Sequence, residues 1–101
     1  MQLTGKQRKF LRGLAHGFSP VVRVGKGGAS EAVVAETKKS LDAHELIKVR
    51  IDADESDRRL ELADKLATAT DAQVAGMIGK TAILYRRREE KPKITLPKST
   101  R

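Results

Sequence analysis

The first apolar positions of the chain recur with the spacing of a helix. Side chains three, four and seven residues apart share one helix face, which predicts a single buried stripe that includes both phenylalanines. The stripe consists of Leu3, Phe10, Leu11, Leu14 and Phe18. Thr4 and Gln7 have the spacing of a capping box, so we expect the helix to begin at Thr4 and to end near Gly17.

The rest of the chain alternates between strand and helix patterns. In segment 45–51, apolar residues alternate with Lys48 and Arg50, which predicts a strand with one apolar face. The expected strands are 21–24, 45–51, 72–78 and 81–85, the last two joined by a hairpin turn at Gly79-Lys80. The other expected helices begin at Ser30 and after the acidic turn at 52–57, with inner positions Val33, Val34, Thr37, Leu41, Leu60, Ala63, Leu66 and Ala67.

This order of elements predicts an α/β fold. The order is α-β-α-β-α-β-β, and the expected architecture is a small mixed four-stranded sheet with helices packed on it. Strand–helix–strand units imply parallel neighbours with right-handed crossovers, and the final hairpin adds an antiparallel pair. We expect one domain over residues 1–86. Residues 87–101 are basic and include Pro92 and Pro97, so we expect a mobile tail with little to bury.

Positive charge is concentrated at the two ends of the chain. The net charge is +8. It divides into +6 over residues 1–30, −3 over 31–85 and +5 over 86–101. In the first helix, Arg8, Lys9, Arg12 and His16 are expected to lie opposite the apolar stripe, with Lys6 at its flank. Segregated positive charge of this kind is typical of a protein with a polyanionic partner.

A glycine-rich loop lies between the first predicted strand and the second helix. It reads Gly25-Lys26-Gly27-Gly28. Backbone amides and the free N–H groups of a helix start can bind an anion, and glycines allow a phosphate to approach the backbone. We therefore predict phosphate contact at this loop. The alternative is a turn that merely requires a positive φ.

Patterns for other chemistry are weak. A dinucleotide fingerprint would need glycine where Ser30 stands, and a P-loop ending at Thr81 would need glycine where Val74 stands. The two histidines, His16 and His44, lie in separate elements, and no active site can be assembled around them. Few aromatic residues are present, and both phenylalanines are expected in the core. Phosphate contact and shape recognition therefore suit the composition better than base stacking, although Tyr85 could stack on a base.

Several motifs occur in an order that resembles a known family. They are Leu3-Thr4-Gly5-Lys6-Gln7-Arg8, Gly13-Leu14-Ala15-His16, the GxxG loop at 25–28, His44-Glu45-Leu46-Ile47-Lys48-Val49, and Ile78-Gly79-Lys80-Thr81 followed by Leu84-Tyr85-Arg86. Together they resemble the CRM domain (chloroplast RNA splicing and ribosome maturation), most closely its stand-alone bacterial YhbY type. The resemblance implies an RNA-binding fold similar to the C-terminal domain of translation initiation factor three. It also implies an association with precursors of the large ribosomal subunit.

We therefore expect an RNA-binding protein and not an enzyme. The expected partner is structured rRNA, namely 23S rRNA in large-subunit precursors, and we expect no cofactor, no small-molecule substrate and no membrane contact. The expected RNA-binding residues are Lys6, Arg8, Lys9, Arg12, Gly25, Lys26, Gly27, Gly28, Lys48, Lys80 and Arg86. The chain has no cysteine, which suits a reducing cytoplasm, and we expect a monomer.

Two alternatives of other classes remain open. The first is a protein-interaction module that docks on an acidic partner. The second, a weaker one, is a metal-dependent nuclease at the acidic turn. That turn carries Asp52, Asp54, Glu55 and Asp57, and such a cluster can hold magnesium but is more often a solvated turn.

Overall fold

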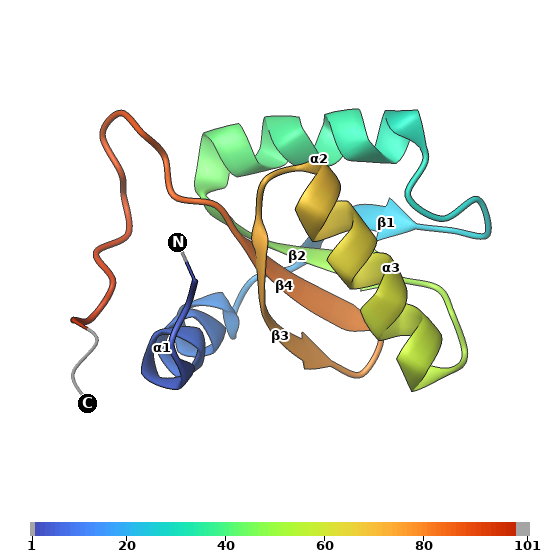
Figure 1. Cartoon of the computed structure of the whole chain (residues 1–101), viewed down its shortest axis with the longest axis horizontal. Coiled ribbons are helices and arrows are strands. Elements are labelled where there is room, and N and C mark those ends of the chain that lie inside the picture. Colours follow the sequence, from blue (N-terminus) through green and yellow to red (C-terminus); the bar gives the residue numbers. More distant parts are fainter. Residues whose placement is uncertain (1, 99–101) are drawn as a thin grey trace.

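Residues 2–98 are described by the computed structural model, and they form three helices and one four-stranded sheet (Figure 1). The elements are α1 (Gly5–Ala15), β1 (Pro20–Val24), α2 (Glu31–His44), β2 (Leu46–Ile51), α3 (Ser56–Ala69), β3 (Gln73–Ile78) and β4 (Thr81–Tyr85). The predicted fold class and element order are confirmed. Both predicted helix starts with polar caps are also present, since Thr4 and Gln7 form the capping box and Ser30 caps α2. None of the helices in this part of the chain is long and apolar enough to cross a membrane.

The sheet has the strand order β1-β2-β4-β3. β1 and β2 are parallel neighbours, as predicted, and β3 and β4 form the predicted antiparallel hairpin. The expectation that every strand–helix–strand unit joins neighbours is wrong for β2 and β3, because β4 lies between them. β4 pairs antiparallel with β2, with Leu46 opposite Tyr85 and Arg50 opposite Thr81. The returning hairpin strand thus fills the gap that the α3 crossover leaves.

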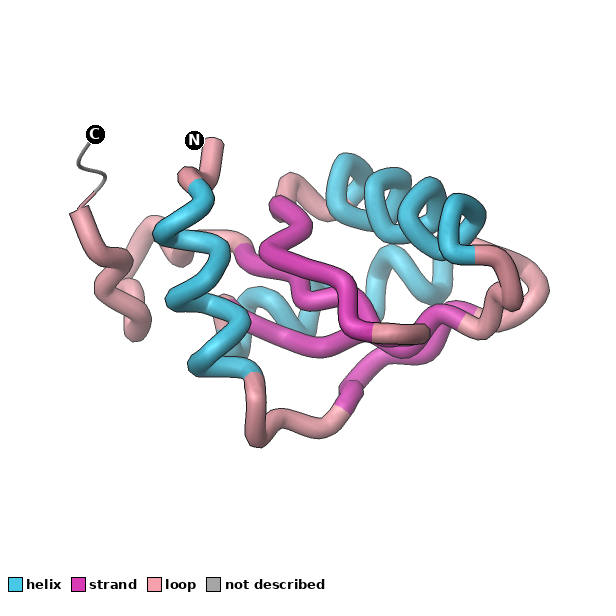
Figure 2. The backbone as a smooth tube through the Cα atoms, turned by 90° about the horizontal axis from the view of Figure 1, so that it is seen from below, coloured by secondary structure: helices cyan, strands magenta, loops and turns pink. Residues whose placement is uncertain are grey.

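Two apolar cores lie on opposite faces of the sheet. α2 and α3 cover one face, where Leu41 and Leu66 pack against strand residues such as Val49. α1 covers part of the other face, where Leu11 and Ala15 pack against Ala75 and other strand residues. In Figures 1 and 2, α1 lies at one end of the long axis and the loop between β1 and α2 lies at the other. The α1-side face is therefore covered only at one end.

The predicted apolar stripe of α1 is wrong in three of its five positions. Leu3 and Leu11 are buried, but Phe10, Leu14 and Phe18 are 38%, 43% and 44% exposed. The helix is turned so that Leu11 and Ala15 face the sheet. The stems of Arg8 and Arg12 lie at the flank of this contact, and long basic side chains can cover apolar surface in this way. In α3, similarly, Leu60 is exposed and Leu62 is buried in its place.

The segment that follows β4 packs back on the domain. Ile94 and Leu96 contact the α1-side core. Buried Glu45 accepts hydrogen bonds from the backbone N–H groups of Arg88, Lys93 and Ile94. The segment over residues 87–98 therefore contacts the domain through a few partly buried side chains, although none of its residues is fully buried. Its mobility stays a prediction.

Candidate nucleic-acid interface

The glycine-rich loop is a tight turn directly before α2. The Gly28 N–H donates to the Gly25 carbonyl at 3.1 Å, and Gly28 has a φ of +68°. A Cβ on Gly28 would meet the Leu62 side chain at 3.4 Å, whereas a Cβ on Gly27 would meet nothing within 4 Å. Gly28 thus has a structural reason to be glycine. Gly27 has none from packing, and it is exposed beside Lys26.

The loop leaves hydrogen-bond donors available. Among the residues that the structure describes, the amides of Lys26 and Gly27 donate to no other protein group. Ser30 caps α2 by accepting from the Val33 N–H at 3.3 Å, and its own N–H donates to the Gly28 carbonyl, which leaves the N–H groups of Glu31 and Ala32 free at the helix start. Free amides, a helix start and a lysine together can bind a phosphate. Glu31, in the first turn of α2, is the one acidic side chain beside them.

The loop and the basic face of α1 do not adjoin. They lie at opposite ends of the molecule in both views (Figures 1 and 2). Between them runs the part of the sheet that α1 leaves uncovered, and three basic side chains lie on it. We call this set, Arg23, Lys48 and Arg50, the basic strip. It links the two sites that the sequence predicted separately.

The basic strip is built by strand register. Arg23 on β1 is the partner of Arg50 on β2, so the two side chains lie next to each other on one face. Their side chains are 73% and 48% exposed. Lys48 lies two residues before Arg50, and its Nζ donates to the His16 carbonyl at 3.3 Å, where α1 ends. Lys48 was a predicted site residue, whereas Arg23 and Arg50 were missed.

Asp52 lies beneath the two arginines. It pairs with Arg23 and with Arg50, the latter at 3.1 Å between Nε and Oδ1. Hydrogen bonds from Arg23 and then Arg50 lower the pKa of Asp52 below its usual 3.8. The carboxylate therefore stays ionised and holds the two guanidinium groups side by side. One negative charge offsets two positive charges, and the pair keeps a net positive charge.

The basic residues of α1 fall into two kinds. Lys6 and Lys9 are exposed, and neither forms an ion pair within residues 2–98. Arg8 and Arg12 are partly buried, and their guanidinium groups donate to the carbonyls of Leu3 at 2.8 Å and Ala75 at 3.3 Å. These arginines thus serve packing at the same time as they add charge.

The two remaining predicted site residues lie elsewhere. Lys80, in the β3–β4 turn, is exposed and approaches the Asp54 carboxylate at 3.5 Å. Arg86 donates to the Thr70 carbonyl at 3.1 Å and pairs with Asp42, so it ties the end of β4 to both α2 and α3. Structural contacts therefore occupy the head group of Arg86.

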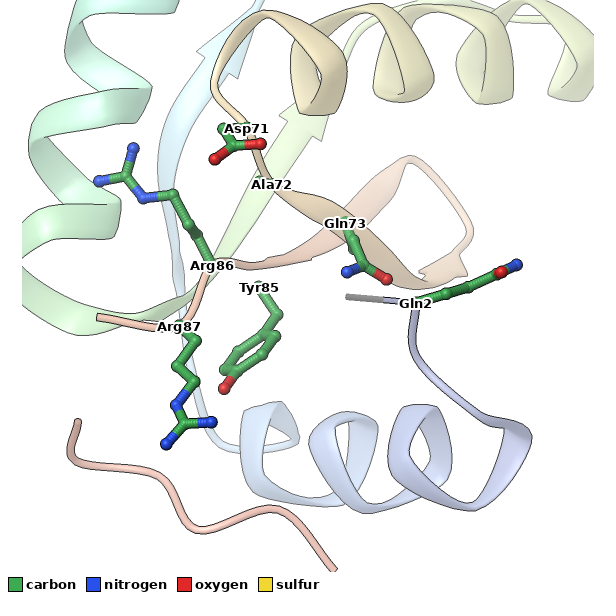
Figure 3. A pocket seen from close by; sticks show the side chains of 7 residues that line it. All are labelled: Gln2, Asp71, Ala72, Gln73, Tyr85, Arg86 and Arg87. Carbon is green, nitrogen blue, oxygen red and sulfur yellow. The ribbon is translucent and has the colours of Figure 1, made fainter. Parts of the chain in front are cut away.

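One hollow in the described structure borders Arg86 but does not form a convergent site. It has a volume of about 570 Å³ and is lined by Gln2, Asp71, Ala72, Gln73, Tyr85, Arg86 and Arg87 (Figure 3). Figure 3 shows Arg86 and Arg87 pointing in different directions. The Tyr85 ring is buried in the α1-side core, which rules it out as an exposed stacking platform. Burial, and next the charge of Glu45, raises the pKa of Tyr85.

The acidic turn contributes ion pairs. Asp52 binds Arg23 and Arg50, and Asp54 lies near Lys80. Over residues 2–98, no group of three histidine or acidic side chains is arranged to hold a metal ion. The geometry of this turn therefore offers no support for a nuclease centre.

Comparison with known proteins identifies the family of this fold. The family model described as the CRS1 / YhbY (CRM) domain matches residues 3–86, which is most of the chain. The chain belongs to the CRM-domain family. Within this CRM domain, the match includes α1, the glycine-rich loop and the basic strip, and it ends at Arg86.

Two bacterial relatives of this CRM domain are proteins of similar length. It is 37% identical to the Bacillus subtilis protein named "Probable RNA-binding protein YqeI", over 94% of this chain and 99% of that one. It is 40% identical to a Haemophilus influenzae protein named "RNA-binding protein", over 95% and 96% of the two chains. The solution structure of a Staphylococcus aureus protein, described as a candidate RNA-binding protein, superposes with a TM-score of 0.85. That protein is 38% identical, and the match covers 95% of this chain and 100% of that one.

Proposed function

We propose that this CRM domain binds structured RNA through its phosphates and catalyses no reaction. The observation that carries the proposal is the side-by-side placement of Arg23 and Arg50 on the open sheet face. This pair continues the positive charge from α1 toward Lys26 in the glycine-rich loop. The names of the relatives in Bacillus subtilis and Haemophilus influenzae support RNA as the partner.

The proposed binding mode combines two kinds of contact. Free amides at Lys26 and Gly27 donate to one phosphate, and glycine at position 27 lets the RNA backbone approach. The basic strip and the lysines of α1 add charges along the sheet. Each phosphate that a cation neutralises releases counterions, so the affinity falls steeply with salt.

The RNA that we propose is 23S rRNA in precursors of the large ribosomal subunit. This proposal follows from the family resemblance, which implies an association with precursors of the large ribosomal subunit. We further propose that the protein acts as a monomer in the cytoplasm, without a cofactor. A density-gradient profile of cell lysate, with and without ribonuclease, tests the assignment. The protein should migrate with large-subunit precursors and lose that migration after ribonuclease treatment, whereas migration that survives the treatment would indicate a protein partner.

A carboxylate at position 27 tests the loop directly. Gly27→Asp adds a negative charge where a Cβ meets nothing, so the fold should persist while phosphate binding weakens. Gly28 suits this test less, because its positive φ makes any side chain strained. Ala35→Asp on the exposed side of α2 makes the same change in net charge and serves as the control.

The readout is the dissociation constant for a structured RNA as a function of salt. We expect Gly27→Asp to weaken binding about tenfold or more and to reduce the salt dependence, because a phosphate contact is lost. Ala35→Asp should stay near the parent protein. If the two variants bind alike, the loop does not hold RNA.

A further inference from the structure

A second hollow lies beside the basic strip, where α1 ends and β1 and β2 begin. Its volume is about 390 Å³. Its apolar lining includes Phe18, Val21 and Leu46, and its basic lining includes Lys48 and Lys93. Its lining contains no acidic side chain. The hollow therefore combines apolar surface, an aromatic ring and positive charge in one place.

Two separate parts of the chain supply the aromatic ring and one of the lysines that line this hollow. Phe18 lies outside the core because α1 turns Leu11 and Ala15 toward the sheet, which leaves an aromatic ring half exposed. Lys93 reaches the hollow from the segment after β4, where its backbone N–H donates to the buried carboxylate of Glu45. The backbone of Glu45 has a φ of +62°, so the chain accepts local strain at the residue that anchors this segment.

We propose that this hollow binds one unstacked nucleobase of the RNA, with the base against Phe18 and a flanking phosphate between Lys48 and Lys93. The inference rests on the proposed function and deepens it. An aromatic ring offers a stacking surface to any base, and cations beside it suit the attached phosphate. Lys48 also belongs to the basic strip, so a strand that leaves the hollow continues directly along that strip.

The dimensions and charge favour a nucleotide over a protein segment. The volume lies at the lower end of the range for small-ligand clefts, roughly 300–1,000 Å³, which accommodates a single base and sugar. An acidic peptide would form ion pairs with the two lysines, but its carboxylates would gain nothing specific from contact with the Phe18 ring. The domain would then prefer RNA with unpaired nucleotides to a continuous duplex, because only an unpaired base can leave its stack cheaply.

Fluorescence offers a direct test, because the chain contains no tryptophan. Phe18→Trp places a single tryptophan in the hollow, and Phe10→Trp places one on α1 outside its lining. The probes are a blunt RNA duplex, the same duplex interrupted by an unpaired loop, and an acidic peptide. We expect the looped RNA to quench the fluorescence of the Phe18→Trp variant strongly, and the other two probes to leave it nearly unchanged. The fluorescence of the Phe10→Trp variant should respond weakly to all three.

Affinity measurements complete the test. Phe18→Ala should weaken binding of the looped RNA by about fivefold to a hundredfold, the range for loss of one base–aromatic stack, and leave duplex binding unchanged. Lys93→Ala should weaken the looped RNA selectively as well. Phe10→Ala is the matched control. If Phe18→Ala and Phe10→Ala bind looped RNA alike, or the acidic peptide alone quenches the Phe18→Trp variant, the inference fails while RNA binding stands. If the parent protein binds neither RNA, the proposed function fails too.

Discussion

The side chain of Arg12 lies directly against the backbone of Gly76. A Cβ built on Gly76 would come within 2.5 Å of Arg12 Cδ and 2.9 Å of Cγ, and the guanidinium donates to the neighbouring Ala75 carbonyl. Glycine at this position of β3 thus makes room for an arginine stem that covers the strand. The contact explains why a basic side chain packs against the sheet, where only apolar side chains of α1 were expected.

Gly76→Ala should therefore displace Arg12. We expect a loss of about 1–2 kcal/mol in the free energy of unfolding, because the added methyl overpacks the contact. In the Arg12→Ala background the same substitution should cost much less, since the stem is gone. Chemical denaturation of the four proteins in the double-mutant cycle measures this coupling. Additive effects would mean that Arg12 does not rest on Gly76 in solution.

Glu45 should hold the segment after β4 on the domain. Glu45→Gly removes the carboxylate but suits the positive φ, so any loss reports the anchor and not backbone strain. We expect a loss of about 2–4 kcal/mol, because three backbone N–H groups lose a charged acceptor. Limited digestion with trypsin, followed by mass spectrometry, should show faster cleavage after Arg87 and Arg88. Unchanged cleavage would show that the anchor is dispensable.

The lowered pKa of Asp52 predicts that the stability of the protein depends on pH. Its pKa is lowered in the folded protein by Arg23 and Arg50, so its stabilising contribution is complete above its usual pKa of 3.8. The contribution disappears as pH falls through the lower, folded-state pKa. Asp52→Asn should therefore lower the melting temperature at pH 7, and the difference from the parent should close at strongly acidic pH. A difference that is constant with pH would contradict this role.

Asp52→Asn should lower the stability of the protein but strengthen its binding to RNA. The substitution releases Arg23 and Arg50 from their shared carboxylate, so we expect tighter binding at low salt and a steeper salt dependence. Glu61→Gln on α3 removes an equal charge from an ion pair away from the basic strip and is the control.

Tyr85 is the only tyrosine, so its ionisation can be followed by absorbance without interference from tryptophan. Burial raises its pKa above the usual 10.0. The unfolded chain releases this proton first, so stability falls as pH rises from about 10 through the folded-state pKa. We expect tyrosinate absorbance to appear together with loss of the helical circular dichroism signal. Ionisation near pH 10 without unfolding would show that the ring is accessible.

Local patterns predicted most of the elements. The Thr4–Gln7 capping box, the Ser30 cap and the alternation in β2 each depend on neighbours in sequence, and each is present. The orientation of α1 was mispredicted because the apolar side chains alone do not show which part of their arc faces the sheet. Arg12 packs against Gly76, and in this orientation Leu11 and Ala15 face the sheet. The exposed phenylalanines follow from that choice.

Long-range contacts were beyond the sequence patterns. Glu45 binds Ile94 across 49 residues, and nothing local distinguishes this glutamate from a solvated one. Arg23 could have been paired with Arg50 only after β1 and β2 were known to be parallel and in register. The predicted RNA-binding residues remain predictions. The structure adds Arg23 and Arg50, which lie on the sheet face between α1 and the glycine-rich loop, whereas Lys80 and Arg86 lie apart from this surface.

The position of β4 has a consequence for how the domain folds during its synthesis. β4 is made after the other three strands, yet it is the inner partner of both β2 and β3. During synthesis, β1 and β2 can pair early, while β3 emerges as a strand with no adjacent partner. The sheet can therefore be completed only after β4 has left the ribosomal exit tunnel. Until then, one edge of β2 has no partner strand in the nascent chain.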